Sequence, residues 1–146
     1  MEKRKTGFWA LIIVAAILVV MFLAGQTLSL FNYQITVEMG LQESADEVTD
    51  VGVAFLKGYA FGDTVFYIPL LIIGIIGLLK RKRWGLFSMV GALAISVYWP
   101  AAILYSIYVD KESMSLAPDK YLSFSILLPL IMIYGLWGMW YLYKSK

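Results

Sequence analysis

Four long apolar stretches, separated by polar segments, dominate the pattern of the chain. They run from about residue 8 to 30, 61 to 79, 84 to 108 and 121 to 143. A helix of about 20 mostly apolar residues is long enough to cross roughly 30 Å of hydrocarbon. The pattern therefore predicts an all-α integral membrane protein, a single domain over residues 1–146 built as a bundle of four transmembrane helices.

The segment between the first two stretches, about residues 32–58, is too long and too mixed for a simple turn. Ser44 and Glu47 have the spacing of a capping box, in which a Ser begins a helix and a Glu reaches back to it. Val51 and Phe55 then recur at helical spacing. We expect an amphipathic helix in this outer loop, either a lid over a pocket or an ordinary surface connector.

The composition agrees with a membrane location and excludes several kinds of chemistry. Hydrophobic residues make up 61% of the chain and charged residues 15%, against about 45–50% and about 25% in soluble domains. The chain has no Cys and no His, which excludes disulfides, thiolate nucleophiles and catalysis by histidine. We expect no catalytic residues, no metal site and no cofactor, and we expect that the protein is not an enzyme.

Charge is distributed unevenly between the two sides of the predicted bundle. Nine of the twelve basic residues lie beside span ends, at residues 3–5, 80–83 and 144–146, whereas nine of the ten acids fall on the other side. Basic residues near span ends are retained in the cytoplasm, so both termini are predicted to be cytoplasmic, in the cell membrane. The cluster from Lys80 to Arg83 is interpreted as a topology determinant, with anionic lipid headgroups as the alternative. The net charge of +2 does not indicate nucleic-acid binding.

Asp63 is the one ionisable residue that falls within a predicted span. An acid at membrane depth is costly, which makes Asp63 a functional-site hypothesis. The sequence Gly62-Asp63-Thr64 also fits a helix start, with the Asp63 carboxylate as the N-cap. Tyr67 follows one turn later on the same face. Both interpretations of Asp63 remain open at this point.

Small residues repeat at helical spacing toward the basic ends of the spans, where they would let helices approach closely. Pro69 and Pro100 fall in the outer halves, where each would kink its helix. The bundle is therefore expected to be tight toward the cytoplasm and open toward the outer side. The expected close-packing residues are Gly74, Gly77, Ser88, Ala92, Ser96, Gly135 and Gly138.

The outer halves combine aromatic residues with a few polar groups, which is typical of small-molecule sites. A carboxylate beside aromatic faces suits a cation or an amine. The alternative is that these polar side chains simply form hydrogen bonds between helices. The candidate ligand-binding residues are Asp63, Tyr67, Tyr98, Trp99, Tyr105, Gln26 and Ser125.

The function expected from these features is non-catalytic binding of a lipid-like or cationic amphiphilic ligand in a pocket of the outer leaflet, with membrane lipids as partners. One alternative is a small-solute or proton/cation-coupled transporter that acts as an oligomer. A further alternative is an assembly or accessory subunit of a membrane complex. The stripes of small residues would also serve contacts in a homo-oligomer or with a membrane-protein partner.

Overall fold

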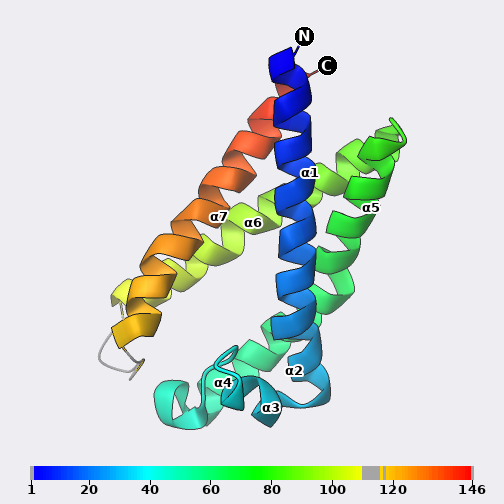
Figure 1. Ribbon diagram of the computed structural model, residues 1–146. Coiled ribbons are helices and arrows are strands. Elements are labelled where there is room, and N and C mark those ends of the chain that lie inside the picture. The colour runs from blue at the N-terminus through cyan, green and yellow to red at the C-terminus, as the bar shows by residue number, and fades with distance from the viewer. Residues whose placement is uncertain (1, 110–115, 117, 146) are drawn as a thin grey trace.

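The computed structural model describes residues 2–109, 116 and 118–145, so that Lys146 of the basic C-terminal end lies outside the description (Figure 1). The described residues are almost entirely helical, and four helices are long and apolar enough to cross a membrane. This confirms the predicted number of spans. The four candidate spans are Lys5–Phe31, Ala45–Leu79, Arg83–Val109 and Pro118–Lys144.

Two of the spans contain a π-helical turn, in which the backbone hydrogen bond reaches back five residues instead of four. The other two spans are single α-helices that contain a proline. The elements in chain order are α1 (Glu2–Phe22), η1 (Leu23–Thr27), α2 (Leu28–Phe31), α3 (Tyr33–Glu38), α4 (Ala45–Gly62), η2 (Asp63–Tyr67), α5 (Ile68–Leu79), α6 (Arg83–Val109) and α7 (Pro118–Lys144).

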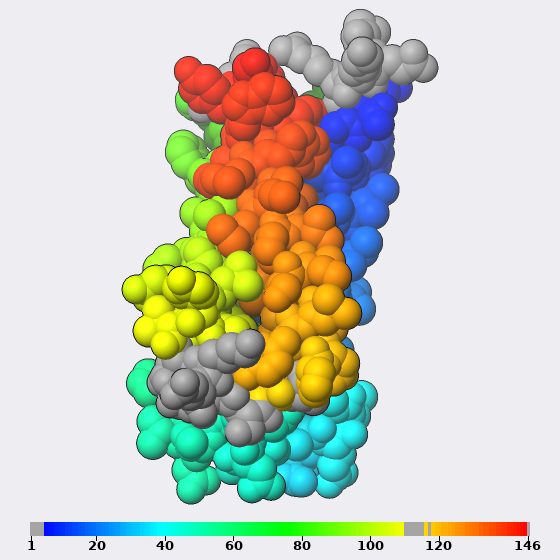
Figure 2. Space-filling view, turned by 90° about the vertical axis from the view of Figure 1, so that its left-hand side faces the viewer, coloured from blue at the N-terminus to red at the C-terminus, as the bar shows by residue number. Residues whose placement is uncertain are grey.

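The helices alternate in direction, so that both ends of the chain lie at the same end of the bundle (Figure 1). We call this the basic end, and the end that carries α3 and the start of α4 the acidic end. α6 crosses the bundle and packs most extensively, against α5 and against α7. Figure 2 shows α7 on one face of the molecule, between α6 and α1. α6 is therefore the central element.

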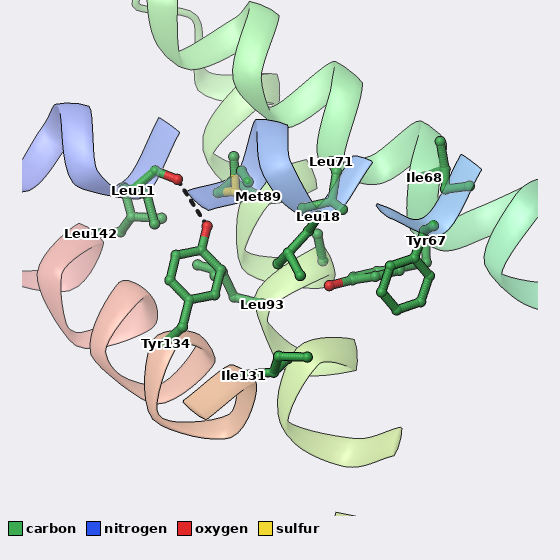
Figure 3. Packing of buried hydrophobic residues seen from close by; sticks show 13 residues of the cluster. Leu11, Leu18, Tyr67, Ile68, Leu71, Met89, Leu93, Ile131, Tyr134 and Leu142 are labelled. Atoms are coloured by element: carbon green, nitrogen blue, oxygen red, sulfur yellow. Dashed lines mark hydrogen bonds between the residues drawn. The ribbon is translucent and has the colours of Figure 1, made fainter. Parts of the chain in front are cut away.

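The core lies where α6 crosses the other spans, and all four spans contribute to it (Figure 3). Leu11, Leu71, Met89 and Leu93 are completely buried. The Tyr134 hydroxyl, on α7, donates a hydrogen bond of 2.9 Å to the Leu11 carbonyl oxygen on α1. A buried hydroxyl without a partner is costly, so this bond holds α7 in register against α1.

Glycine permits the close approach of α5 to α6. A Cβ on Gly74 would lie 3.0 Å from the backbone of Met89, and one on Gly77 would collide with the backbone of Gly85. Small residues at such contacts let two backbones pack directly in lipid, where van der Waals contact replaces the hydrophobic effect. The glycine contacts thus fix the hairpin formed by α5 and α6.

The predicted small residues on α6 and α7 lie close to this contact. Ala92 and Ser96 are fully buried and Ser88 is half-buried. A Cβ on Gly135 would lie 2.8 Å from the Leu93 carbonyl oxygen on α6. A Cβ on Gly138 would lie 2.9 Å from side-chain atoms of both Leu11 and Leu93. These positions seat α7 against α6 and α1.

The second span begins much earlier than the predicted residue 61. One helical segment runs from Ala45 to Leu79, so Asp63 lies inside it and the interpretation of Asp63 as an N-cap is wrong. The capping box starts the helix instead, as the Ser44 N–H donates a 2.9 Å hydrogen bond to the Glu47 carboxylate. The helical segment that starts in the predicted loop, kinked at Thr49, thus continues into the apolar stretch of the second candidate span.

This long segment bends once, at Thr49, where φ is 67° and ψ is 166°. A β-branched residue rarely adopts a positive φ. The Thr49 hydroxyl accepts a 3.4 Å hydrogen bond from the Gly52 N–H, as an N-cap would. Val51 and Phe55, the apolar residues predicted to face one way, are exposed beyond this bend.

We predict that Gly77→Ala destabilises the protein by about 1–3 kcal/mol, because the new methyl group would force α5 away from α6. The matched control is Gly58→Ala on α4, where no atom lies within 4 Å of the added Cβ. That change should be neutral or stabilising by up to about 1 kcal/mol, since Ala favours helix over Gly. Unfolding in detergent, followed by circular dichroism, measures both. Equal changes in the free energy of unfolding for Gly77→Ala and Gly58→Ala would contradict the proposed role of the glycine contact.

Candidate functional site

The two π-helical turns, η1 and η2, contact each other at the acidic half of the bundle. The Thr27 and Thr64 hydroxyls join them through a hydrogen bond of 3.0 Å. Isolated π-turns inside α-helices occur frequently at functional sites. Two of them, bonded to one another across neighbouring spans, therefore identify the region that we treat as the candidate site.

Pro69 accounts for the second π-turn. Proline has no N–H, and in a regular α-helix its ring would collide with the carbonyl group of Val65, four residues earlier. In the structure the Ile68 N–H donates to the Asp63 carbonyl oxygen, so the wider turn lies directly before the proline. The kink predicted at Pro69 thus takes the form of a π-turn.

Polar side chains bind the first π-turn from outside the span. Gln42, which precedes α4 and is 3% exposed, donates from Nε2 to the Gly25 carbonyl oxygen and to Gln26 Oε1, both at 3.2 Å. The Ser29 hydroxyl donates to the Gln26 carbonyl oxygen at 2.7 Å. Because interrupted helices in membranes need such replacement donors, Gln42 is part of the site. Sequence reasoning missed Gln42, since a Gln in a polar loop carries no distinguishing pattern.

Asp63 is half-buried at the first position of η2, directly before Thr64. Within the described part of the chain its carboxylate makes no hydrogen bond and no ion pair. Asp63 therefore differs from the nearby polar side chains, which form two hydrogen-bonded pairs, Gln26 with Gln42 and Thr27 with Thr64. We call the set Gln26, Thr27, Gln42, Asp63 and Thr64 the polar cluster.

An aromatic group lies next to the polar cluster on the core side. The Phe22 ring meets the Tyr67 ring edge-on at 4.8 Å and the Trp99 ring at 5.5 Å, measured between centroids. Tyr67 is 1% exposed, and its hydroxyl lies 2.7 Å from Ser96 Oγ. Since Ser96 donates its proton to the Ala92 carbonyl oxygen, Tyr67 is the donor to Ser96. The Trp99 Nε1 atom is buried and has no hydrogen-bond partner among the described residues.

The structure does not bring the remaining candidates into the polar cluster. Tyr98 is 73% exposed and Tyr105 68%, so both rings lie on the surface of α6. Tyr98 precedes Trp99 by one residue, and adjacent residues of a helix point to different faces. Ser125 is exposed on α7 and donates to the Tyr121 carbonyl oxygen at 2.7 Å. Of the predicted set, Asp63, Tyr67, Trp99 and Gln26 lie in this region.

Charged groups hold the acidic end together. Lys120 Nζ, at the start of α7, lies 2.9 Å from Glu47 and 4.0 Å from Glu43. Burial raises the pKa of the Glu43 carboxyl above its ordinary value, although Lys120 favours the charged form. Burial also raises the pKa of Tyr33 to about 12, and the negative charge of Glu43 acts in the same direction. The Tyr33 hydroxyl donates to the Glu43 carbonyl oxygen at 2.8 Å.

The basic end is more open than predicted. Two adjoining cavities of about 480 and 490 Å³ lie between the start of α1, the turn from α5 to α6, and the end of α7. The tight packing expected toward this end is found between α5 and α6, while the turn between them leaves space beside the ends of α1 and α7. The glycine contacts bind α5 only to α6, whereas this turn stands apart from the paired ends of α1 and α7 (Figure 1).

Comparison of the chain with models of known protein families, with curated proteins and with solved structures found no match. Among the described residues, no group of three or more His, Cys, Asp or Glu side chains is arranged to hold a metal ion.

We predict that the Thr27–Thr64 bond couples the two spans by about 0.5–1 kcal/mol, the usual range for hydrogen bonds between membrane helices. A double-mutant cycle of Thr27→Val and Thr64→Val, measured by unfolding in mixed micelles, gives this energy. Pairing Thr27→Val with Ser106→Ala is the control, because the Ser106 hydroxyl donates within its own helix to the Ala102 carbonyl oxygen. Strictly additive effects of the two Thr changes would exclude the coupling.

The raised pKa of Glu43 also predicts that the stability of the folded protein depends on pH. The folded state favours the protonated carboxyl, so this contribution to stability is present below the ordinary pKa of Glu and is lost as the pH rises through the raised value. Glu43→Gln should therefore stabilise the protein at pH 7, by up to about 1 kcal/mol, and have little effect near pH 4. Thermal unfolding at both pH values measures the difference. Asp50→Asn removes the charge of an exposed acid on α4 and is the control for loss of charge alone. A Glu43→Gln variant that is less stable than wild type at pH 7 would contradict the account.

Proposed function

We propose that the protein is a non-catalytic membrane protein that binds an amphiphile through its polar cluster, with the cationic head of the ligand next to Asp63. The observation that carries the proposal is the half-buried Asp63 carboxylate, which has no partner among the described residues. It lies beside two bonded π-turns, about 24 Å along the helix from Leu79 at 1.5 Å per residue.

The cost of burying a carboxylate supports a ligand of this charge. An unpaired charge at membrane depth destabilises a protein, and a positive head group would offset that cost by pairing with it. The surrounding Gln26 and Thr64 side chains offer further polar atoms for the head group. A cation therefore complements the cluster better than an anion does.

The surface next to Asp63 supports an amphiphile over a small polar solute. Val65 and Phe66 follow Asp63 on the same span and are 44% and 61% exposed. An apolar tail that lay along these side chains would stay in contact with the hydrocarbon region while the head reached the cluster. The Trp99 N–H, which has no acceptor within the described part of the chain, offers an additional donor for a ligand that carries an oxygen.

A titration with dodecyltrimethylammonium tests the proposal, since its positive charge does not depend on pH. The protein, labelled with ¹⁵N at its Trp indoles, is placed in nanodiscs of zwitterionic lipid. We expect a saturable shift of the Trp99 indole signal, which is close to the polar cluster through the Phe22 and Tyr67 rings. Trp9 and Trp140 lie at the basic end and should shift far less.

Asp63→Asn should weaken this binding at least about tenfold, because it keeps the shape of the side chain and removes its charge. Asp50→Asn, which makes the same change at an exposed acid earlier on α4, should leave the affinity unchanged. Circular dichroism establishes that both variants keep their helices. Equal affinities of wild type and Asp63→Asn would refute recognition of the cation by Asp63.

A further inference from the structure

The two cavities at the basic end have walls from three separate parts of the chain. Their lining combines apolar and aromatic side chains with basic side chains and one hydroxyl. Both cavities are lined by Phe8, Leu78, Arg81, Tyr141 and Ser145.

Basic side chains form a large part of the lining. Arg81 and Lys82 in the turn from α5 to α6 and Arg83 at the start of α6 line the first cavity, and Lys5 and Arg81 line the second. None of the four forms an ion pair with any described residue. Within the sequence of this end only Glu2 carries a negative charge. The lining therefore carries positive charge that no described residue pairs in an ion pair.

The turn holds these side chains in a defined arrangement. Arg81 adopts the left-handed conformation, with φ of 53°, and the Lys82 N–H donates a 2.8 Å hydrogen bond to the Gly77 carbonyl oxygen. Because Gly77 itself lies against Gly85, the base of the turn is fixed by the contact of α5 with α6. The three basic residues are thus presented by a short, braced turn.

The opposite wall is also fixed before any ligand binds. A Cβ on Gly7 would lie 2.7 Å from the Tyr141 ring, so glycine lets this ring lie directly against α1. The Tyr141 ring stacks on Trp137 at 5.6 Å between centroids. The Ser145 hydroxyl donates to the Tyr141 carbonyl oxygen at 2.7 Å. An aromatic wall therefore faces the basic turn across the cavity.

We propose that these cavities bind an anionic phospholipid of the leaflet at the basic end. Arg81, Lys82 and Arg83 would hold the phosphate, since guanidinium and ammonium groups are the usual partners of phosphate oxygens. An acyl chain would lie against Phe8 and Leu78. Basic pockets between membrane helices are typical sites for anionic lipid heads, and a soluble phosphate would leave the apolar walls uncovered. This site is separate from the polar cluster and takes a ligand of the opposite charge.

Native mass spectrometry of the full chain in detergent tests this proposal. The protein is mixed with equal amounts of palmitoyl-oleoyl phosphatidylglycerol and palmitoyl-oleoyl phosphatidylcholine, which differ in the charge of the head. We expect wild type to retain phosphatidylglycerol preferentially, and this preference should fall as the salt concentration rises. Equal retention of the two lipids would overturn the proposal.

Variants locate the site. Arg81→Gln should lower the retention of phosphatidylglycerol about fivefold, and Arg81→Gln combined with Lys82→Gln about 30-fold, as expected for independent basic contacts. Arg81→Lys should restore most of the loss. Lys57→Gln, which removes a basic residue at the acidic end, should have no effect. If the double variant retains as much phosphatidylglycerol as wild type, the assignment to this cavity is overturned. The salt dependence of lipid retention by wild type tests the role of charge without any variant.

A competition experiment separates the lipid from a soluble ligand. Inorganic phosphate or glycerol 3-phosphate at millimolar concentration should displace little of the bound phosphatidylglycerol, because neither covers the apolar walls. Displacement by either compound at the affinity of the lipid itself would show that the cavity binds a free phosphate and would overturn the lipid assignment. The Asp63→Asn variant should retain phosphatidylglycerol normally, so failure of the amphiphile proposal would leave this one standing.

Discussion

In hydrocarbon no water is present to bond a free backbone group, so each carbonyl or N–H that leaves the helical pattern needs a partner from the protein. This constraint governs the acidic half of the bundle. Where the first span widens into a π-turn, Gln42 reaches in to bond the Gly25 carbonyl oxygen, and the hydroxyls of Thr27 and Thr64 bond each other. A polar cluster inside an apolar bundle is the direct result. Asp63 lies in this cluster and lacks a partner among the described residues.

Charge divides the molecule into two ends with different chemistry. At the acidic end, Lys120 bonds Glu47 and lies near Glu43, so the acids of the loop are partly neutralised. At the basic end, Arg81, Lys82 and Arg83 line open cavities and form no ion pair with any residue that the structure describes. The two proposed ligands follow from this division: a cationic head at the polar cluster and an anionic lipid at the basic end. The glycine contact between α5 and α6 connects the two, since it fixes both the turn and the span that carries Asp63.

Sequence alone predicted the four spans, because the length of an apolar run depends on membrane thickness and not on packing. The capping box at Ser44 and Glu47 is likewise a local signal, and the helix starts there. The π-turns were not predictable by helical counting, which assumes a constant 3.6 residues per turn. The N-cap interpretation of Asp63, one of the two that the sequence left open, fails because the preceding residue Gly62 is already helical. Whether α1 and α7 would close over the basic turn depends on crossing angles, which no spacing in the sequence specifies.

The central claim is that a bound amphiphile completes the polar cluster at Asp63. Native mass spectrometry of the protein, released gently from the membrane in which it was made, tests this claim most directly. The account predicts a discrete additional mass that is retained by wild type and by Arg81→Gln but lost in Asp63→Asn. A wild-type spectrum without any additional mass that Asp63→Asn removes would contradict it and leave the polar cluster as a packing contact between helices.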